Sequence, residues 1–566
     1  MDNQPSKNNE QTFEAIVNEN SSPASTNLPV GTVVKLNKSK NSTTEKVKDL
    51  NDETASQSSS EQLSKPKRLW PVVFSIAALL ILLVATLWFI KPGSHKNIAY
   101  QVKKDIPLLR YTSKEKGWNA FYPGSDNSTS FTEANRNIFE GLVRFENKSK
   151  IVPLLATGWQ NPDDKTWIFA LKSNVKFHSG RTMTAQDVKD SFEEAKTSNY
   201  GEIDAATIKS IEVLDPTHVK ITTDGPDPLL LNKLTTYYVF DTKSGKKNDP
   251  YNGTGPFNIK PGTVAEDTSL HLIAFDAYHG GHVYVRALDF TYINEQTAEL
   301  YEADKVDFAN AFGENISSLK RPNAVLQIEP LSTFILGINI NRISSPLHNL
   351  KVRQAIQIGI NPIALEDIRK EHGNDANQLI PPGIPGYNTA ISKIEHDETK
   401  ARSLLAEAGF GKGFTITLTY YAPSEATAKE FQRQFKNIGI TLKLDPQTET
   451  KILAQKAFNG GTDMFFTTPS SDYTDSSDIF SIYTSGVNYR NPKIDDLLKQ
   501  AATTLDTSAR TKLLEQASTI SAEDVSVIPI YNASNLHAIY NPSYVVQKDV
   551  PGLELGVYFG KVYAKY

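Results

Sequence analysis

An uncharged and strongly apolar stretch, Leu69–Ile90, constrains the fold of the chain most. Its 22 residues would span about 33 Å as an α-helix, enough to cross a hydrocarbon core of about 30 Å. Trp70 and Trp88 lie near the two ends, where amphipathic rings favour the lipid headgroups. A cleaved signal peptide would instead carry a shorter apolar segment directly after a brief basic start. We therefore predict an uncleaved membrane-spanning helix.

Residues 1–68, before this stretch, consist mainly of Asn, Ser, Thr, Lys and Glu. Phe13 is their only aromatic residue, and nine Lys/Arg balance nine Asp/Glu. Such a composition cannot bury enough apolar surface to offset the entropy lost on ordering. We predict a disordered tail here and a polar linker at residues 91–105. Basic residues flank the apolar stretch on both sides, so their distribution does not decide the membrane topology.

The composition of the whole chain excludes several classes of protein. Its 566 residues, 39% of them hydrophobic, are enough for several buried cores. A net charge of -4 without a long basic block argues against a nucleic-acid partner. The absence of cysteine excludes disulfides, thiolate ligands, a cysteine nucleophile and a lipidated cysteine. Common hydrolase, zinc-protease, phosphate-loop and EF-hand motifs are also missing, so we expect no enzyme and no cofactor.

From Ile106 onward the hydrophobic pattern is typical of a globular domain. Thr184 and Asp187 resemble a helix capping box, and Asp397 resembles the N-cap of another helix. Further elements follow from periodicity and from glycine stops: strands at 167–171, 414–418 and 441–444, and helices that end at Gly409 and near Gly439. Because helices and strands interleave, the sequence predicts an α/β architecture.

Three histidines lie in segments with more than one interpretation. His279 and His282, separated by two glycines, could share a metal ion, but no nearby residue completes a ligand set. We favour a solvated turn for this pair and a structural role at a strand end for His178. Residues 252–256 lack the third glycine of a dinucleotide-binding loop, so they are predicted to form a turn. We expect no metal site.

The segment 470–478 (SSDYTDSSD) concentrates three aspartates among small polar residues. A calcium loop is disfavoured, because the spacing differs and the bidentate glutamate is missing. The aspartates could belong to an exposed loop or provide a counter-charge for a cationic ligand. From the residue chemistry alone, the exposed loop is the simpler interpretation.

A series of short motifs follows in order along the chain. The series consists of FEGL at 139–142, PLLA at 153–156 before Gly158-Trp159, WIFALKSNVKFHSGRTMTAQDVKDSF at 167–192, GTGPF at 253–257, KVDFA at 305–309, VRQAI at 352–356, ARSLLAEAGF at 401–410, NIGI at 437–440, DYTD at 472–475, NYRNP at 488–492 and VIPIY at 527–531. In this order the motifs resemble the extracytoplasmic solute-binding proteins of ABC importers in the oligopeptide, dipeptide and nickel family, solute-binding protein family 5. The resemblance covers about residues 130 to 535.

The resemblance implies an α/β, two-lobe periplasmic-binding-protein-like fold of type II, in the large peptide-binder variant. Lobe 1 would comprise residues 106–328 together with 530–566, and lobe 2 would comprise residues 329–529. The chain would cross between the lobes near 328–334 and return near 525–531. The lobes would close around a ligand by a hinge motion.

The resemblance also implies where a ligand binds. In similar peptide binders the ligand lies extended between the lobes and pairs its backbone with both. The aspartate that binds the α-amino group falls on Asp472, with Ser470 beside it. The opposing strand falls near residues 127–130, which makes Asn127, Ser128 and Thr129 the further candidate ligand-binding residues. Asp475 and Asp478 are expected to be solvated loop charges.

This chain departs from the family pattern at three points. Pro469 replaces the aromatic residue three positions before the amino-binding aspartate, so the first side-chain pocket would differ. His279 replaces the aromatic residue before the Gly-Gly pair. Residues 121–123 (FYP) replace an early Leu-Asp-Pro segment, which makes the alignment near Asn127 loose. No distinctive histidine is present for a nickel chelate, so an oligopeptide ligand is favoured.

The family is usually anchored by a lipidated cysteine or not at all, so the helix at 69–90 would take the anchoring role. It would leave the tail in the cytoplasm and the carboxyl-terminal domain outside the cell. We expect a monomer that binds oligopeptides and delivers them to the permease subunits of an ABC transporter. Two alternatives stay open: a membrane-anchored receptor or sensor of the same fold, and a binder of a non-peptide ligand such as a nickel chelate.

Overall fold

A computed structural model describes parts of the compact unit Ile98–Tyr566. The described residues are 103–113, 129–146, 150–196, 207–244, 252–260, 269–292, 296–311, 316, 318–327, 332–369, 374–469, 475–484, 489–532, 537–546 and 557–565. The predicted tail and the predicted membrane helix at 69–90 lie outside them. No helix within the described ranges combines the length and apolar character needed to span a bilayer.

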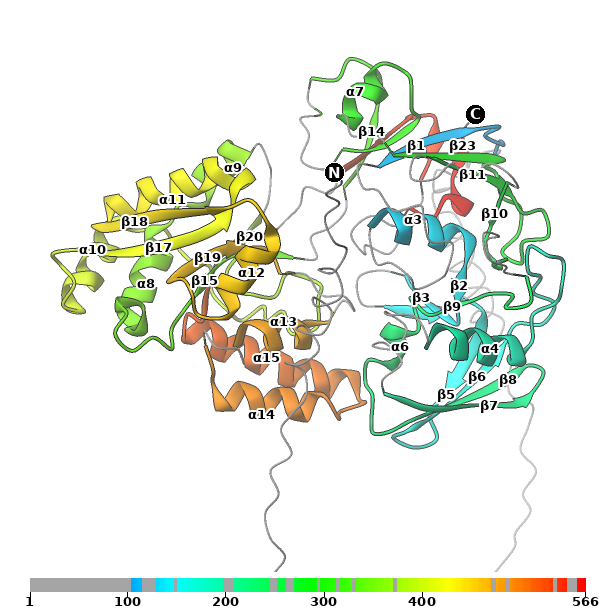
Figure 1. The fold of residues 1–566 in the computed structure, drawn as a ribbon, viewed down its shortest axis with the longest axis horizontal. Helices are drawn as coiled ribbons and strands as arrows, with labels where there is room; N and C mark the ends of the chain where they lie inside the picture. Colours follow the sequence, from blue (N-terminus) through cyan, green and yellow to red (C-terminus); the bar gives the residue numbers. More distant parts are fainter. Residues whose placement is uncertain are drawn as a thin grey trace, which may run out of the picture. The chain divides into compact units, whose positions relative to one another are not determined.

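The first region combines residues from both ends of this unit around a seven-stranded sheet (Figure 1). Strand β1 runs parallel to its neighbours β12 and β13, whereas the other pairs are antiparallel. Aromatic side chains of Tyr111, Phe290, Phe308 and Phe559 pack against one another in its core. In spatial order the strands are β10 (Phe257–Ile259), β11 (Ser269–Ala274), β12 (Ala287–Tyr292), β1 (Leu109–Ser113), β13 (Phe308–Asn310), β21 (His537–Tyr540) and β14 (Ala324–Gln327).

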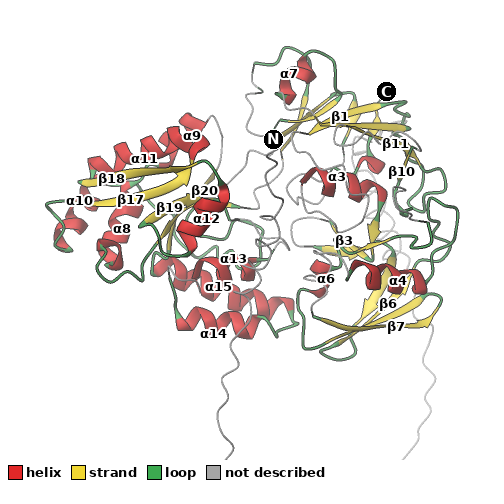
Figure 2. Ribbon diagram, viewed as in Figure 1, coloured by secondary structure: helices red, strands yellow, loops and turns green. Residues whose placement is uncertain are grey.

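A four-stranded antiparallel sheet, packed against helix α4 (Ala185–Ala195), forms a further part of this region with its own core (Figure 2). Its order is β5 (Ala156–Gln160), β6 (Thr166–Leu171), β8 (His218–Thr223) and β7 (Ile208–Asp215). Buried and partly exposed residues alternate along β6, which confirms the predicted strand. The backbone N–H of Thr184 donates to Asp187 at 2.8 Å, which confirms the predicted cap of α4.

The remaining described elements of the first region are three small sheets and several helices. Three two-stranded sheets pair β2 (Glu140–Gly141) with β9 (Tyr238–Val239), β3 (Val143–Phe145) with β4 (Ile151–Pro153), and β22 (Tyr544–Val545) with β23 (Tyr563–Ala564). The helices are α3 (Thr129–Ile138), α6 (Leu230–Lys233), α7 (Thr297–Glu302) and the 3-10 turn η3 (Phe559–Lys561).

The second region contains a six-stranded mixed sheet covered by helices (Figure 2). In order its strands are β16 (Asn374–Asp375), β20 (Val527–Asn532), β15 (Thr333–Ile338), β19 (Met464–Thr467), β17 (Phe414–Tyr421) and β18 (Ile440–Gln447). Its helices are η1 (Pro346–His348), α8 (Leu350–Gly359), α9 (Pro362–Arg369), α10 (Glu398–Glu407), η2 (Ala422–Ser424), α11 (Glu425–Asn437), α12 (Thr450–Phe458), α13 (Ser476–Thr484), α14 (Pro492–Ala501) and α15 (Thr507–Glu523).

The local signals read from the sequence of this region are confirmed. The side chain of Asp397 accepts a hydrogen bond from the backbone N–H of Lys400 at 2.8 Å and caps α10. Gly409 and Gly439 follow α10 and α11 with φ angles of +86° and +91°. Because a side chain disfavours that backbone conformation, glycine there ends a helix at little cost.

Two pairs of strands lie where the chain passes between the regions. In the first region Gln327 of β14 pairs with His537 of β21, and in the second Thr333 of β15 pairs with Asn532 of β20. The Thr333 hydroxyl donates to Oδ1 of Asn532 at 3.0 Å, and both residues are buried. The outgoing and returning segments are therefore held together at both of their ends.

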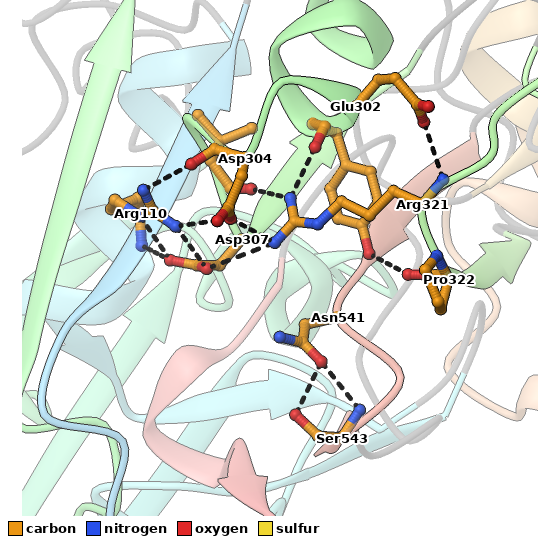
Figure 3. A network of polar contacts seen from close by, with 10 residues as sticks. Arg110, Glu302, Asp304, Asp307, Arg321, Pro322, Asn541 and Ser543 are labelled. Atoms are coloured by element: carbon orange, nitrogen blue, oxygen red, sulfur yellow. Dashed lines mark hydrogen bonds and ion pairs between the residues drawn. The ribbon is translucent and has the colours of Figure 1, made fainter.

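An ion-pair network holds the approach to β14 in the first region (Figure 3). Arg110 of β1 donates from Nε and Nη2 to the two carboxylate oxygens of Asp307, at 2.8 and 2.9 Å. Arg321 donates to Asp304 at 2.7 Å and lies over the ring of Tyr301 at 4.2 Å. The network therefore joins β1, the turn before β13 and the segment that enters β14.

The GTGPF motif packs against the carboxyl end of α3. The backbone N–H of Gly255 donates to the carbonyl of Ile138 at 2.9 Å, which satisfies one of the last carbonyls of the helix. A Cβ on Gly253 would lie 2.0 Å from that carbonyl oxygen and 2.7 Å from the ring of Phe139. Only glycine fits this approach without moving the backbone.

We expect Gly253→Ala to lower the free energy of unfolding by about 1–3 kcal/mol or more, because the methyl group would overlap backbone atoms. Gly158→Ala is the matched control, since a Cβ there meets no atom within 4 Å. Urea unfolding at pH 7 measures both variants. Equal stability of the two would contradict the packing described for Gly253.

Candidate functional site

The candidate ligand-binding residues lie largely outside the described residues. This holds for Asn127, Ser128, Ser470 and Asp472. Thr129 is described only as the first residue of α3. An extended strand predicted across 127–130 is therefore wrong for Thr129 and Ser130, which are helical. The helical state has a packing reason, because Ala134 and Ile138 of α3 lie one turn apart and both enter the core.

The segment that contains Ser470 and Asp472 is held at its amino-terminal end by β19. This strand lies between β15 and β17, and its last residue Thr467 pairs with Ile335. Phe465 and Phe466 are buried, and so is Pro469 at the end of the described residues. Packing and strand pairing therefore fix the chain up to Pro469.

At the other end of the segment, Asp475 forms a buried ion pair with Arg510 of α15. Nη2 of Arg510 donates to Oδ1 of Asp475 at 2.8 Å, and Nη1 donates to Oδ2. The side chains are only 2% and 8% exposed. The expectation that Asp475 is a solvated loop charge is therefore wrong. The guanidinium of Arg510, 35 residues away in the sequence, binds both oxygens of its carboxylate.

The Asp475–Arg510 pair also connects three helices. Oδ1 of Asp475 accepts from the backbone N–H and the hydroxyl of Ser477, at 2.9 and 2.6 Å, and so caps the start of α13. Nε of Arg510 donates to the carbonyl of Ala501, the last residue of α14, at 3.1 Å. The position at which the chain enters α13 is thus fixed relative to α14 and α15.

A second buried polar cluster surrounds Glu140 in the first region. Oε1 of Glu140 accepts from the hydroxyl of Tyr278 at 2.9 Å, and Oε2 accepts from the hydroxyl of Thr254 at 2.9 Å. The hydroxyl of Tyr558 lies 2.5 Å from that of Tyr278. Burial, together with the neighbouring Glu140, raises the pKa of both tyrosines well above the usual value, so both stay protonated.

His279 lies in a turn, as predicted, but its side chain belongs to this buried cluster and is not solvated. Its side chain is 9% exposed, and its Nε2 lies 2.7 Å from Oε2 of Glu140. The predicted solvation is confirmed for His282, whose ring is 51% exposed and pairs with Asp105. The two imidazoles thus bind different carboxylates. Within the described ranges, no group of three or more His, Asp or Glu residues is arranged to hold a metal ion.

His178 joins the VKFHSG and GTGPF motifs in the same region. Its Nε2 donates to the carbonyl of Gly255 at 3.0 Å, and its backbone N–H donates to the carbonyl of Gly253 at 2.9 Å. Burial lowers the pKa of His178 to about 4. The hydrogen bond to Gly255 and the charge of nearby Glu140 raise this pKa, but burial has the larger effect. The ring is therefore neutral at pH 7 and has the structural role that the sequence predicted.

The pairing of these buried groups was not predicted from the sequence. Arg510 gives no local signal, because its partner is brought to it only when α13 and α15 pack. Tyr558, which contacts Glu140, lies 418 residues further along the chain. The FEGL and DYTD motifs could have indicated these buried charges, because they contain Glu140 and Asp475.

Comparisons with known proteins agree with this fold. The sequence profile described as bacterial extracellular solute-binding proteins, family 5 Middle, matches residues 150–491, which is more than half of the chain. The chain belongs to this family. Family 5 proteins are extracytoplasmic solute-binding proteins of ABC importers, and they bind solutes without catalysing a reaction.

Several family 5 relatives resemble most of this chain. The dipeptide-binding protein of Escherichia coli (strain K12) is 24% identical over 491 residues, 75% of this chain and 88% of that protein. Di/tripeptide-binding protein 1 of Pseudomonas aeruginosa (strain UCBPP-PA14) is 28% identical over 470 residues, 73% of this chain and 86% of that protein. The unliganded open form of the murein tripeptide-binding protein MppA has a TM-score of 0.72 at 23% identity, covering 82% of this chain and 98% of that one. The α/β periplasmic-binding-protein-like fold is therefore confirmed.

The buried neutral His178 predicts a pH dependence of stability. The pKa of His178 rises from about 4 in the folded chain to the ordinary value near 6.5 on unfolding, so the unfolded state binds a proton first as the pH falls. Stability is therefore complete above pH 6.5 and is lost between pH 6.5 and 4, by up to about 3 kcal/mol. Between pH 7 and 5 the wild type should lose about 2 kcal/mol more than His178→Gln.

Urea unfolding of both proteins at pH 7 and pH 5 provides the measurement. His282→Gln changes an exposed ring and should follow the wild-type pH dependence to within about 0.5 kcal/mol. If His178→Gln loses as much stability as the wild type, His178 is not the group that titrates.

Proposed function

We propose that this family 5 protein binds oligopeptides between two lobes and delivers them to the permease of an ABC importer. Asp472 holds the α-amino group of the peptide, the residues around Ser470 supply backbone partners for it, and residues 127–129 contribute from the opposite lobe. The observation that carries the proposal is the DYTD segment. Strand β19 precedes this segment, and the last residue of the segment, Asp475, pairs with Arg510.

The names of the relatives favour a peptide over other ligands. Dipeptides, di- and tripeptides and a murein tripeptide are named for several of them. One solved relative, DppA of Helicobacter pylori, is described in complex with the peptide STSA and has a TM-score of 0.63 at 23% identity. Other relatives are named for heme, glutathione or nickel, so the family alone does not decide the ligand.

The chemistry of a peptide amino terminus gives the proposal its physical basis. An ammonium group that loses its water needs an opposite charge within about 4 Å. Asp475 cannot serve, because Arg510 and Ser477 already occupy its carboxylate. Asp472 is the nearest aspartate on the amino-terminal side, in a segment that the family resemblance assigns to the ligand.

The two regions of the fold provide the lobes of the proposal. The first region corresponds to lobe 1, residues 106–328 with 530–566, and the second to lobe 2, residues 329–529, except that residues 530–532 belong to β20 of the second region. The segments that join Gln327 to Thr333 and Asn532 to His537 would form the hinge, because each lies between paired strands. A peptide that binds the closed form better would shift the population toward it.

The proposal includes anchoring by one membrane helix at 69–90, with the tail 1–68 in the cytoplasm and the binding domain outside. The uncharged run and the extracellular description of the family support this arrangement. A protein held at the membrane stays close to the permease, which raises its local concentration there.

We expect Asp472→Ala to weaken binding of tri-alanine by about 30-fold to several thousand-fold, because a buried ammonium without its partner costs roughly 2–5 kcal/mol. Calorimetry with tri-alanine and N-acetyl-tri-alanine gives the measurement. The wild type should bind the acetylated peptide much more weakly, and Asp472→Ala should hardly distinguish the two peptides.

Asp496→Ala is the control for this experiment, since the Asp496 side chain is 71% exposed and pairs only loosely with Lys499 at 3.8 Å. It should change the affinity by well under 1 kcal/mol. Equal binding of both peptides by the wild type would exclude an α-amino site at Asp472. Mass spectrometry of the ligand retained by the purified protein would then separate a heme or metal chelate from a peptide held elsewhere.

The membrane topology is tested separately in intact cells. Protease added outside should degrade the domain beyond residue 91 and spare a tag on the amino-terminal tail, because only the domain is exposed to it. Permeabilised cells, in which both parts are degraded, are the control. Protection of the domain in intact cells would overturn the proposed orientation.

A further inference from the structure

We infer that Leu505 makes a closure contact: its side chain, from the second region, packs against a core of the first region and favours the closed form of the protein before any ligand binds. Leu505 lies in the turn 502–506, which joins α14 to α15. This role rests on the proposed function, because lobe closure is the motion that peptide binding would use. Leu505 acts through the balance of open and closed forms and not through a contact with the ligand.

The core against which Leu505 packs belongs to the first region. It is built from the four-stranded sheet, α4 and α6, and Phe169, Phe192 and Leu230 are among its buried members. Among the described side chains in this core or packed against it, Leu505 is the only one from the second region. Leu497 of α14, by contrast, packs against the core of its own region. Leu505 therefore contributes to the core of the region to which it does not belong.

The residues next to Leu505 in the turn are open to solvent. Ala502, Thr503 and Asp506 are exposed, whereas Leu505 is partly buried. If the two regions moved apart, the leucine side chain would lose this cover and face water, which disfavours exposed apolar surface. The contact therefore gives the closed form a free-energy advantage that the open form lacks.

Hydrogen bonds hold the turn that carries Leu505. Oδ1 of Asp506 accepts from the backbone N–H of Ala509 at 2.7 Å and caps α15. At the other end, the hydroxyl of Thr504 donates to the carbonyl of Gln500 at 2.7 Å. A turn held in this way has little conformational entropy left to lose when Leu505 makes its contact.

The contact and the proposed hinge involve different sheets of the first region. Strands β14 and β21, next to the connections between the regions, belong to the seven-stranded sheet. The core under Leu505 belongs to the four-stranded sheet. A rotation about the hinge would move this separate part of the region relative to Leu505. The contact is therefore made in the closed form and lost in the open form.

The test measures the distance between the two regions in the purified full chain without ligand. The chain has no cysteine, so Ser210→Cys in β7 and Lys493→Cys in α14 introduce two unique sites for spin labels, both at exposed positions. Pulsed electron paramagnetic resonance then gives the distribution of distances. Leu505→Ser removes the apolar contact, and Leu505→Met keeps it. Leu214→Ser is the matched control, because Leu214 of β7 is 46% exposed.

We expect short and long distances in the wild type, from the closed and open forms. The ratio of short to long distances should fall about tenfold in Leu505→Ser and stay unchanged in Leu505→Met and Leu214→Ser. The affinity for tri-alanine, measured by calorimetry, should fall by up to the same factor in Leu505→Ser, because a smaller fraction of the protein is ready to bind. If Leu505→Ser does not fold, Leu505→Ala takes its place with the same expectations.

The outcomes separate the closure contact from the proposed function. An unchanged distance ratio in Leu505→Ser, or a wild type with long distances alone, overturns the closure contact and leaves the proposed function intact. A lower ratio in Leu505→Ser supports the closure contact. If tri-alanine does not shift the wild-type distances in the same experiment, the closure contact stands and peptide-driven closure is overturned.

Discussion

The passage of the chain between its two regions is the constraint on which the rest of this structure depends. The chain leaves after β14 and returns before β21, and these strands pair with each other, as do β15 and β20 on the other side. Each connection is thereby tied to its counterpart at both ends. In the proposed hinge motion, bending would occur in the few residues between these strands. The two sheets would then move as units.

The network of Arg110, Asp304, Asp307 and Arg321 fits this constraint. It lies directly before β14, on the side where the chain leaves the first region (Figure 3). The carbonyls of Tyr301 and Val306 accept from Arg321, at 2.6 and 2.8 Å, so backbone as well as side chains is held. On the other side, Arg353 donates to the carbonyls of Asp524 and Val525 just before β20. An arginine therefore holds the backbone by hydrogen bonds on each side, Arg321 near β14 and Arg353 near β20.

Much of the local structure could be predicted from the sequence, because the signals are local. The capping side chain of Asp397, the glycine after α10 and the alternation along β6 each act within a few residues. The partners of buried charges could not be predicted in this way. His279 looked like part of a solvated Gly-Gly turn, and its burial depends on Glu140, which is 139 residues away. Asp475 looked like a loop aspartate for the same reason, since Arg510 is absent from its neighbourhood in the sequence.

The candidate site was predicted from the family motifs and not from residue chemistry. Relatives on one fold are named for dipeptides, heme, glutathione and nickel, so a few residues must decide the ligand. The family resemblance places Pro469 where an aromatic residue is expected, and proline offers neither a large ring nor a backbone N–H. A ligand would lose both kinds of contact at that position. Recognition of the charged amino terminus, which any unmodified peptide carries, would then supply a larger share of the binding energy than recognition of the first side chain.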